Sequence, residues 1–229
     1  QPLWGRGMQY MTMLGDEITP ALSVISDPYM KDVASVAYNS ETQLVTDVWF
    51  SLYAGINRAN GIIENVPSIN MDGTRKAQII TEARFLRSYY AFYLAILYGG
   101  VPFPQTYHVD AKAPRLPLNE VYALIEQDFT HAYQTLSNRN DKAGRVNKWT
   151  AAGFLLKMYS YLASSKENNV GVSLNFPLNS FSCVDANAYY NKALTIAKDI
   201  HTNSQYKLVT PYYAPFYADT KTQQKEEAL

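Results

Sequence analysis

The chain has 229 residues, which is enough for one domain with a substantial buried core. Basic and acidic residues both number 20, so the formal net charge is zero at pH 7; this argues against nucleic acid and anionic lipid as partners, because both attract cationic surfaces. The single cysteine, Cys183, rules out an internal disulfide framework. His108, His131 and His201 are widely spaced, so we expect surface or loop histidines, no metal and no cofactor.

The first 66 residues predict an irregular start followed by a helix. Glycines and prolines interrupt residues 1–40, which indicates short helices joined by loops. Apolar side chains then recur with helical periodicity over 41–66, and Pro67 ends the pattern. Thr74 is the expected N-cap of the next helix.

The segment 77–102 is the most informative part of the chain. It predicts one long helix with two arginines near its start and many aromatic residues after them. A Gly-Gly-Val-Pro stop at 99–102 ends it, because glycine adopts the left-handed conformation of a helix end and proline prevents continuation. Four large side chains share one helical face: Leu86, Tyr90, Tyr93 and Leu97.

Three further helices are predicted after an irregular, proline-rich connection. Asn119 is the expected N-cap of the first, which extends to about Leu136. The second covers about 148–163, and Asp185 caps the third.

Between these helices the composition predicts loops. Residues 137–144 are polar, and 164–184 are rich in Ser, Asn, Gly and Pro. We expect the second segment to be an exposed loop pinned by Phe176 and Phe181. Alternation typical of a strand occurs only over 206–209.

Helices joined in pairs by short connections indicate stacked helix-turn-helix units. Their lengths are close to the ~34-residue period of tetratricopeptide repeats, although the repeat consensus is poorly kept. The periodicity therefore predicts an all-α, tetratricopeptide-like solenoid of helical pairs with irregular loops.

The run E-A-R-F-L-R-x-x-Y-x-F-x-L-x-x-x-Y-G-G-V-P, residues 82–102, resembles the signature helix of the SusD/RagB family. Residues 57–64 and 144–152 resemble two further segments of that family. The resemblance implies a glycan-binding lipoprotein on the outer surface of a Gram-negative outer membrane. The positions that match the structural signature are Glu82, Arg84, Arg87, Gly99, Gly100 and Pro102.

The same resemblance implies that the chain is part of a longer protein. Family members are roughly twice as long, so we expect 1–229 to be a single N-terminal helical domain without its leader, lipid-anchoring cysteine and C-terminal half. The chain would then meet the membrane only through a lipid anchor that it lacks. The partners implied are a glycan and a SusC-like TonB-dependent transporter.

Charged side chains in the segment 82–87 allow two interpretations. An arginine fork binds carboxylate or phosphate well, so Glu82, Arg84 and Arg87 could form a site. We favour a network of ion pairs that fixes one helix to another, and expect the same of Arg58 and Arg145. The adjacent acidic pairs of the chain do not supply the facing carboxyls of a glycosidase, so no catalytic residue is expected.

Glycan contacts are expected from aromatic and polar side chains near the N-terminus. A sugar ring presents an apolar face to an aromatic ring and a hydroxyl rim to polar groups. In the family such contacts come from a loop after an acidic segment, which Gly15-Asp16-Glu17 matches here. The starch-binding prototype's tryptophan has no counterpart in this loop, which weakens the case for starch. The candidate ligand-binding residues are Tyr29, Asp27, Tyr38 and Trp4.

The sequence therefore predicts non-catalytic binding of oligo- or polysaccharide at the cell surface, for delivery to the transporter. Two alternatives remain open. One is a helical-repeat module that binds proteins, and the other is an α-helical carbohydrate-active enzyme.

Overall fold

The computed structural model describes residues 28–108, 110, 112–139, 144–208, 210 and 213. In this part of the chain the structure is all-α and tetratricopeptide-like, as predicted. The elements in chain order are α2 (Pro28–Ala34), α3 (Gln43–Asn65), η2 (Val66–Ser68), α4 (Gly73–Tyr98), α5 (Leu118–Thr135), α6 (Lys148–Glu167), η3 (Val172–Leu174), η4 (Pro177–Asn179) and α7 (Ala186–Asn203).

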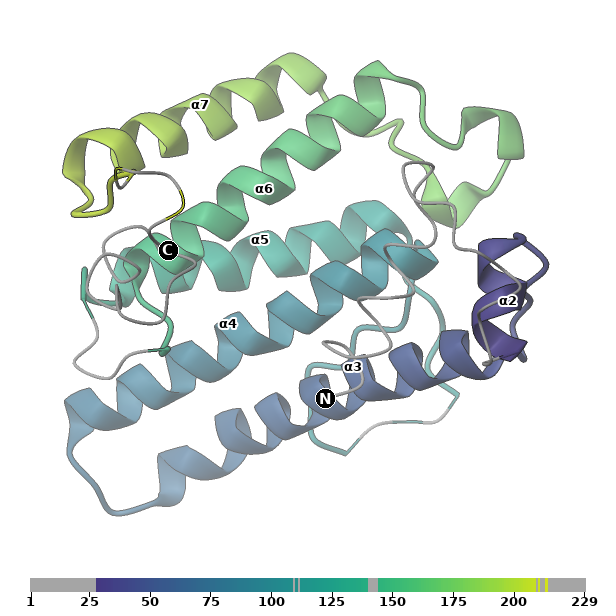
Figure 1. Ribbon diagram of the computed structural model, residues 1–229. Helices are drawn as coiled ribbons and strands as arrows, with labels where there is room; N and C mark the ends of the chain where they lie inside the picture. Colours follow the sequence, from purple (N-terminus) through teal and green to yellow (C-terminus); the bar gives the residue numbers. More distant parts are fainter. Residues whose placement is uncertain are drawn as a thin grey trace.

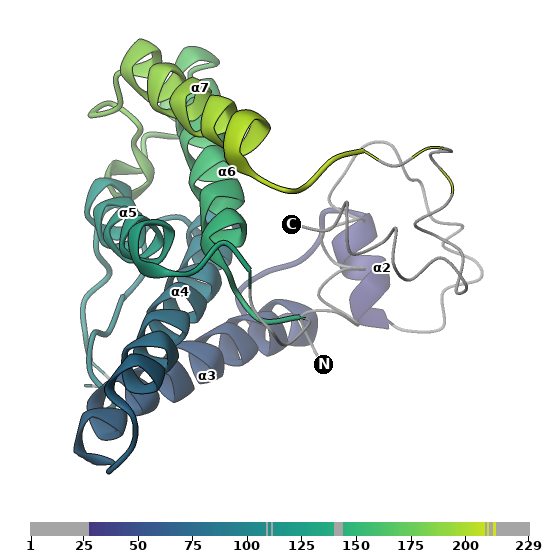
Figure 2. The same ribbon diagram turned by 90° about the vertical axis from the view of Figure 1, so that its left-hand side faces the viewer.

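The five long helices stack in chain order. Each packs mainly against the helix before it and the helix after it, so α3 and α7 form the two ends of the stack (Figure 1). Viewed at right angles, α5 lies out of the plane of α4 and α6, which gives the stack a turn (Figure 2). The short helix α2 lies against the beginning of α3.

Side-chain caps fix where α4, α6 and α7 begin, and at α6 the side chain of Asn147 accepts from the N–H groups of Trp149 and Thr150. The carboxylate of Asp72 accepts a hydrogen bond from the backbone N–H of Arg75, so the N-cap of α4 is Asp72 and the prediction of Thr74 was wrong. Asp185 caps α7 as predicted. The prediction for α5 was wrong, because Pro117 occupies the N-cap position and Asn119 lies inside the first turn.

The core of the stack runs along α4, α5 and α6. Phe92 and Phe129 are fully buried and lie edge to face at its centre. The face of α4 predicted to be apolar is only partly buried: Leu86 is 37% exposed, whereas Tyr90, Tyr93 and Leu97 are half-buried and pack against the core. Because α4 packs between α3 and α5, its fully buried residues extend beyond this one face, and a single apolar periodicity could not identify all of them.

The glycine stop after α4 is confirmed and has a tertiary role. Gly99 has φ 75°, and a Cβ built there would overlap the side chain of Asn179. The Asn179 side chain accepts a hydrogen bond from the N–H of Gly100, which ties the end of α4 to the loop before α7. The hydroxyl of Tyr53 donates to the carbonyl of Pro102, so the same turn is fixed to α3.

The loop predicted over 164–184 begins later than expected, because α6 continues to Glu167. Phe181 is buried and pins the loop as predicted, whereas Phe176 is 57% exposed and does not. Residues 206–208 form no strand, and residue 209 lies outside the described part. Among the described residues no helix has the length and apolar character to cross a bilayer.

Candidate functional site

Asp128 of α5 lies at the centre of a buried polar network. Its Oδ1 accepts from Nε of Arg84 at 2.8 Å, and its Oδ2 accepts from Nη2 of Arg87 at 2.7 Å and from the hydroxyl of Ser88 at 3.0 Å. Its side chain is 1% exposed. Because a buried carboxylate is costly without partners, these bonds explain how the charge is accommodated.

The network extends from α4 to α3 and to the loop that follows α4. Arg87 donates to Oδ1 of Asn60 on α3, and the amide nitrogen of Asn60 donates to the carbonyls of Pro104 and Thr106. Arg87 on α4 therefore connects to α5 through Asp128 and to α3 through Asn60, and Asn60 in turn holds the loop that follows α4. This confirms the interpretation of these residues as a network that fixes one helix to another.

Glu82 forms a second ion pair, with Arg145 before α6. Its carboxylate also accepts from the side-chain amide of Gln78. The prediction for Arg145 is thus confirmed, whereas the prediction for Arg58 was wrong, because its side chain is exposed on α3.

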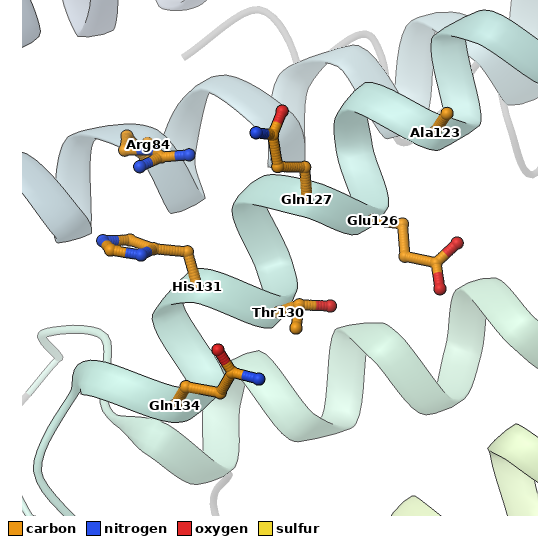
Figure 3. A pocket seen from close by; sticks show the side chains of 7 residues that line it. All are labelled: Arg84, Ala123, Glu126, Gln127, Thr130, His131 and Gln134. Atoms are coloured by element: carbon orange, nitrogen blue, oxygen red, sulfur yellow. The ribbon is translucent and has the colours of Figure 1, made fainter.

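A hollow of about 510 Å³ opens beside this network on the outer face of α5. Figure 3 shows Arg84, Gln127 and His131 gathered toward α4, while Glu126 and Thr130 point to the opposite side of the hollow. The residues that line it are Arg84, Ala123, Glu126, Gln127, Thr130, His131 and Gln134.

The electrostatics of the hollow differ between its two sides. On the α4 side His131 lies 3.3 Å from the hydroxyl of Thr81, and burial together with the nearby Arg84 lowers the pKa of its imidazole. On the opposite side Glu126 accepts hydrogen bonds from Tyr159 and Lys192, so its charge is already matched. The arrangement can bind a polar ligand whose anionic group lies toward α4.

The hollow does not follow from the sequence pattern alone. His131 was expected at the surface or in a loop, whereas it lies half-buried in α5. A sequence pattern existed, because polar residues recur at helical spacing from Glu126 to Gln134 on one face of a predicted helix. Such a pattern is also typical of an ordinary solvated helix face. Only the position of Arg84 distinguishes a binding face from a solvated face.

The glycan-binding residues predicted from the sequence fall in a different place. Trp4 and Asp27 lie outside the described residues, and Tyr29 lies in α2. Tyr38 follows α2 and is half-buried against a small apolar cluster of Val33 and Leu44. The structure thus brings Tyr29 and Tyr38 to the same end of the stack.

Exposed polar and apolar residues flank Tyr38 along the chain. Asp32 and Asn39 are exposed, and Val36 is 76% exposed with φ 56°. The side chain of Asn39 accepts from the N–H of Glu41, and its own N–H donates to Thr42, which orders the turn before α3. An aromatic ring beside ordered polar groups can bind a sugar ring by its apolar face and its hydroxyl rim.

Residues 2–160 match a family model described as SusD-like, "Starch-binding associating with outer membrane". This match covers more than half of the chain. The chain belongs to the SusD-like family. The positions that suggested the resemblance, from Glu82 to Pro102, all lie within the matched part.

Similar proteins include SusD-like protein P2 of Formosa agariphila, which is 26% identical over 163 residues, or 69% of this chain and 32% of that protein. A SusD-like protein of Bacteroides ovatus is 32% identical over 133 residues, or 56% of this chain and 24% of that protein. The SusD-like chain described here thus spans about a third or less of these relatives.

A solved structure with a xylogluco-oligosaccharide has a similar fold. Its TM-score is 0.69 at 24% sequence identity, and the match covers 99% of this chain and 44% of the other. This match shows that the shared fold extends beyond residue 160 and includes α6 and α7.

Proposed function

We propose that this SusD-like chain is part of a cell-surface protein that binds oligo- or polysaccharide without cleaving it, for delivery to a TonB-dependent outer-membrane transporter. The observation that supports it most is the family match over 2–160, whose description names starch binding and association with the outer membrane. A similar fold in a structure that holds a xylogluco-oligosaccharide supports a glycan as ligand.

The ion pairs of the buried carboxylates support a non-catalytic role. Glycoside hydrolysis requires two carboxyls that flank one bond across a cleft. The buried carboxylates Glu82 and Asp128 are instead bonded to arginines of the scaffold. Their charges support helix packing, and neither carboxylate is left to act as an acid or base.

We propose Tyr38 and Tyr29 as ring-stacking residues, with Asp27 at the hydroxyl rim and Trp4 as a further contact. Shallow sites of this kind are weak for one sugar, since exposed hydroxyls exchange water for protein partners with little net gain. Repeated units of a polysaccharide then raise the avidity.

The test is retention of the 229-residue chain in affinity gels that contain neutral polysaccharides, among them starch, xyloglucan and laminarin. Tyr38→Ala and Tyr29→Ala should each reduce retention without lowering the melting temperature by more than a few degrees. Tyr190→Ala is the matched control, because Tyr190 is also partly exposed but lies on α7 at the other end of the stack. Equal retention of all three variants would remove this end of the molecule as the site.

One observation favours the alternative of a protein-binding module. Four apolar side chains at alternate positions of the loop before α7 are exposed: Val170, Val172, Leu174 and Phe176. Exposed apolar patches of this kind mark interaction surfaces. Absence of retention on every gel would favour this alternative.

A further inference from the structure

The hollow on α5 contains a guanidinium with unused hydrogen-bond donors. Arg84 donates to Asp128 only through Nε, and within the described residues its two terminal nitrogens make no hydrogen bond. Its side chain is 24% exposed and lines the hollow. Four N–H donors of the guanidinium therefore face the hollow or the solvent above it (Figure 3).

The charge balance around Arg84 is positive. One carboxylate, Asp128, is shared by two guanidiniums, those of Arg84 and Arg87. Asp128 and Arg87 are buried, so the accessible part of this positive charge lies on Arg84. Glu82, which lies two positions before Arg84 in the chain, is engaged by Arg145. A planar fork with free donors and unmatched charge binds a carboxylate in two-pronged geometry.

The remaining lining matches sugar hydroxyls. Gln127 and Gln134 each offer an amide donor and acceptor, and Thr130 offers a hydroxyl. The second carboxylate oxygen of Glu126 makes no hydrogen bond in the described part, so it can accept from a hydroxyl. Within the described part of the chain no Phe, Tyr or Trp side chain is among the residues that line the hollow, which disfavours a neutral sugar held by stacking alone.

We propose that the hollow on α5 binds a carboxylate-bearing sugar, a uronic acid unit of a glycan, with its carboxylate on Arg84 and its hydroxyls toward Thr130 and Glu126. The hollow is open to solvent, and its volume of about 510 Å³ leaves room for one sugar ring without enclosing it. This inference rests on the proposed glycan-binding function, but it concerns a different face of the molecule from Tyr38.

The experiment measures binding of methyl glucuronide, methyl glucoside and acetate to the 229-residue chain by calorimetry at low ionic strength. The glucuronide should bind at least about tenfold more tightly than either other probe, because charge-assisted hydrogen bonds add to those of the hydroxyls. Equal binding of glucoside and glucuronide would overturn the proposal. Equal binding of acetate would show a bare anion site and overturn the assignment to a sugar.

Gln127→Glu places a competing carboxylate beside Arg84 without changing the size of the side chain. It should weaken glucuronide binding by about tenfold or more while leaving the melting temperature unchanged. Asn119→Asp is the matched control, since it adds the same charge to an exposed position of α5 outside the hollow. Equal weakening by both variants would indicate a general charge effect and contradict the proposal.

A second readout follows the imidazole of His131. Burial and then Arg84 lower the pKa of His131, and Asp128 raises it, so the negative charge of a carboxylate bound on Arg84 should raise this pKa in an NMR titration. No change at saturating glucuronide would place the ligand elsewhere. Two variants separate the two sites. Tyr38→Ala should lose retention on neutral polysaccharide and keep glucuronide binding, whereas Gln127→Glu should weaken glucuronide binding and keep retention on neutral polysaccharide.

Discussion

Asp128 shows how one residue can hold several elements together. It accepts from two arginines and a serine while almost fully buried, and one of those arginines continues to Asn60 of α3. Buried ion pairs of this kind add little net stability over apolar packing, but they are strongly destabilising when one partner is removed. The network therefore specifies how α3, α4 and α5 align.

We expect Asp128→Asn to lower the free energy of unfolding by about 3–5 kcal/mol, because it leaves two guanidiniums without a buried counter-charge. Urea denaturation followed by circular dichroism measures this loss. Asp110→Asn is the control, since Asp110 is exposed and, among the described residues, its side chain accepts only from the N–H of Lys112. If Asp128→Asn lowers the free energy of unfolding by less than about 1 kcal/mol, the ion pairs of the network contribute no more than exposed surface pairs do, and the prediction is wrong.

At the scale of elements, Gly55 of α3 and Gly153 of α6 differ in whether a neighbouring helix packs against them. Gly55 of α3 lies under the ring of Tyr90 of α4, and a Cβ there would overlap the ring. Gly153 of α6 has no atom within 4 Å of an added Cβ. The first glycine permits close approach of two helices, whereas the second only weakens its own helix.

Gly55→Ala should therefore destabilise the chain by about 1–3 kcal/mol, as expected for overpacking. Gly153→Ala should stabilise it by about 0.5–1 kcal/mol, because alanine favours the helix and meets no obstacle. Paired denaturation curves measure both changes. The opposite order of stability would contradict the α3–α4 packing described here.

A polar contact joins α5, α6 and α7. The hydroxyl of Tyr133 donates to the carboxylate of Asp199, and Lys148 lies 3.6 Å from the same carboxylate. The bond from Tyr133, with smaller contributions from Asn203 and Lys148, lowers the pKa of Asp199 below its ordinary value of 3.8. Burial and the contact with Asp199 raise the pKa of Tyr133 to about 12.

These shifts set the direction of the pH dependence. Because the folded pKa of Asp199 is lowered, its contribution to stability is present above pH 3.8 and is lost as the pH falls through the folded value. Tyr133→Phe should raise the pKa of Asp199 toward 3.8 in a carboxyl NMR titration. Tyr190→Phe, which removes a hydroxyl bonded to Glu167, should leave Asp199 unchanged. An unshifted pKa in Tyr133→Phe would contradict the contact.

At the scale of the whole molecule, the helices form a stack in which neighbours in sequence are neighbours in space. Stability in such stacks is roughly a sum over units and their interfaces, so the ends open first. The end helix α7 buries only Ala193 and Ile196, while α4 buries ten residues. Local opening should therefore begin at α7.

Hydrogen exchange measured by mass spectrometry should show faster exchange in α7 than in α4 and α5. Ile196→Ala should speed exchange in α7 further and leave α4 nearly unchanged, because the removed contacts lie at the α6–α7 interface. Uniform acceleration across all helices would indicate that the described part opens as one unit and would contradict this prediction.

Much of this organisation was readable from the sequence because it depends on local chemistry. Asp185 as N-cap, the stop at Gly99 and Gly100, and the helices themselves follow from bonds within a few residues. The resemblance of residues 82–102 also identified the family correctly. Thr74 was wrong for the same local reason, since Asp72 two residues earlier offers a competing cap.

What the sequence could not give depends on contacts between distant residues. Arg84 and Asp128 are 44 positions apart, so the hollow on α5 and the unused donors of Arg84 became visible only when the helices were packed. Phe176 and Phe181 are equally apolar, yet only Phe181 reaches the core. Helical periodicity and caps determined which segments are helices, because they act over one or two turns. Tertiary packing decided which faces are buried and which charges stay accessible, because those depend on partners that sequence spacing does not specify.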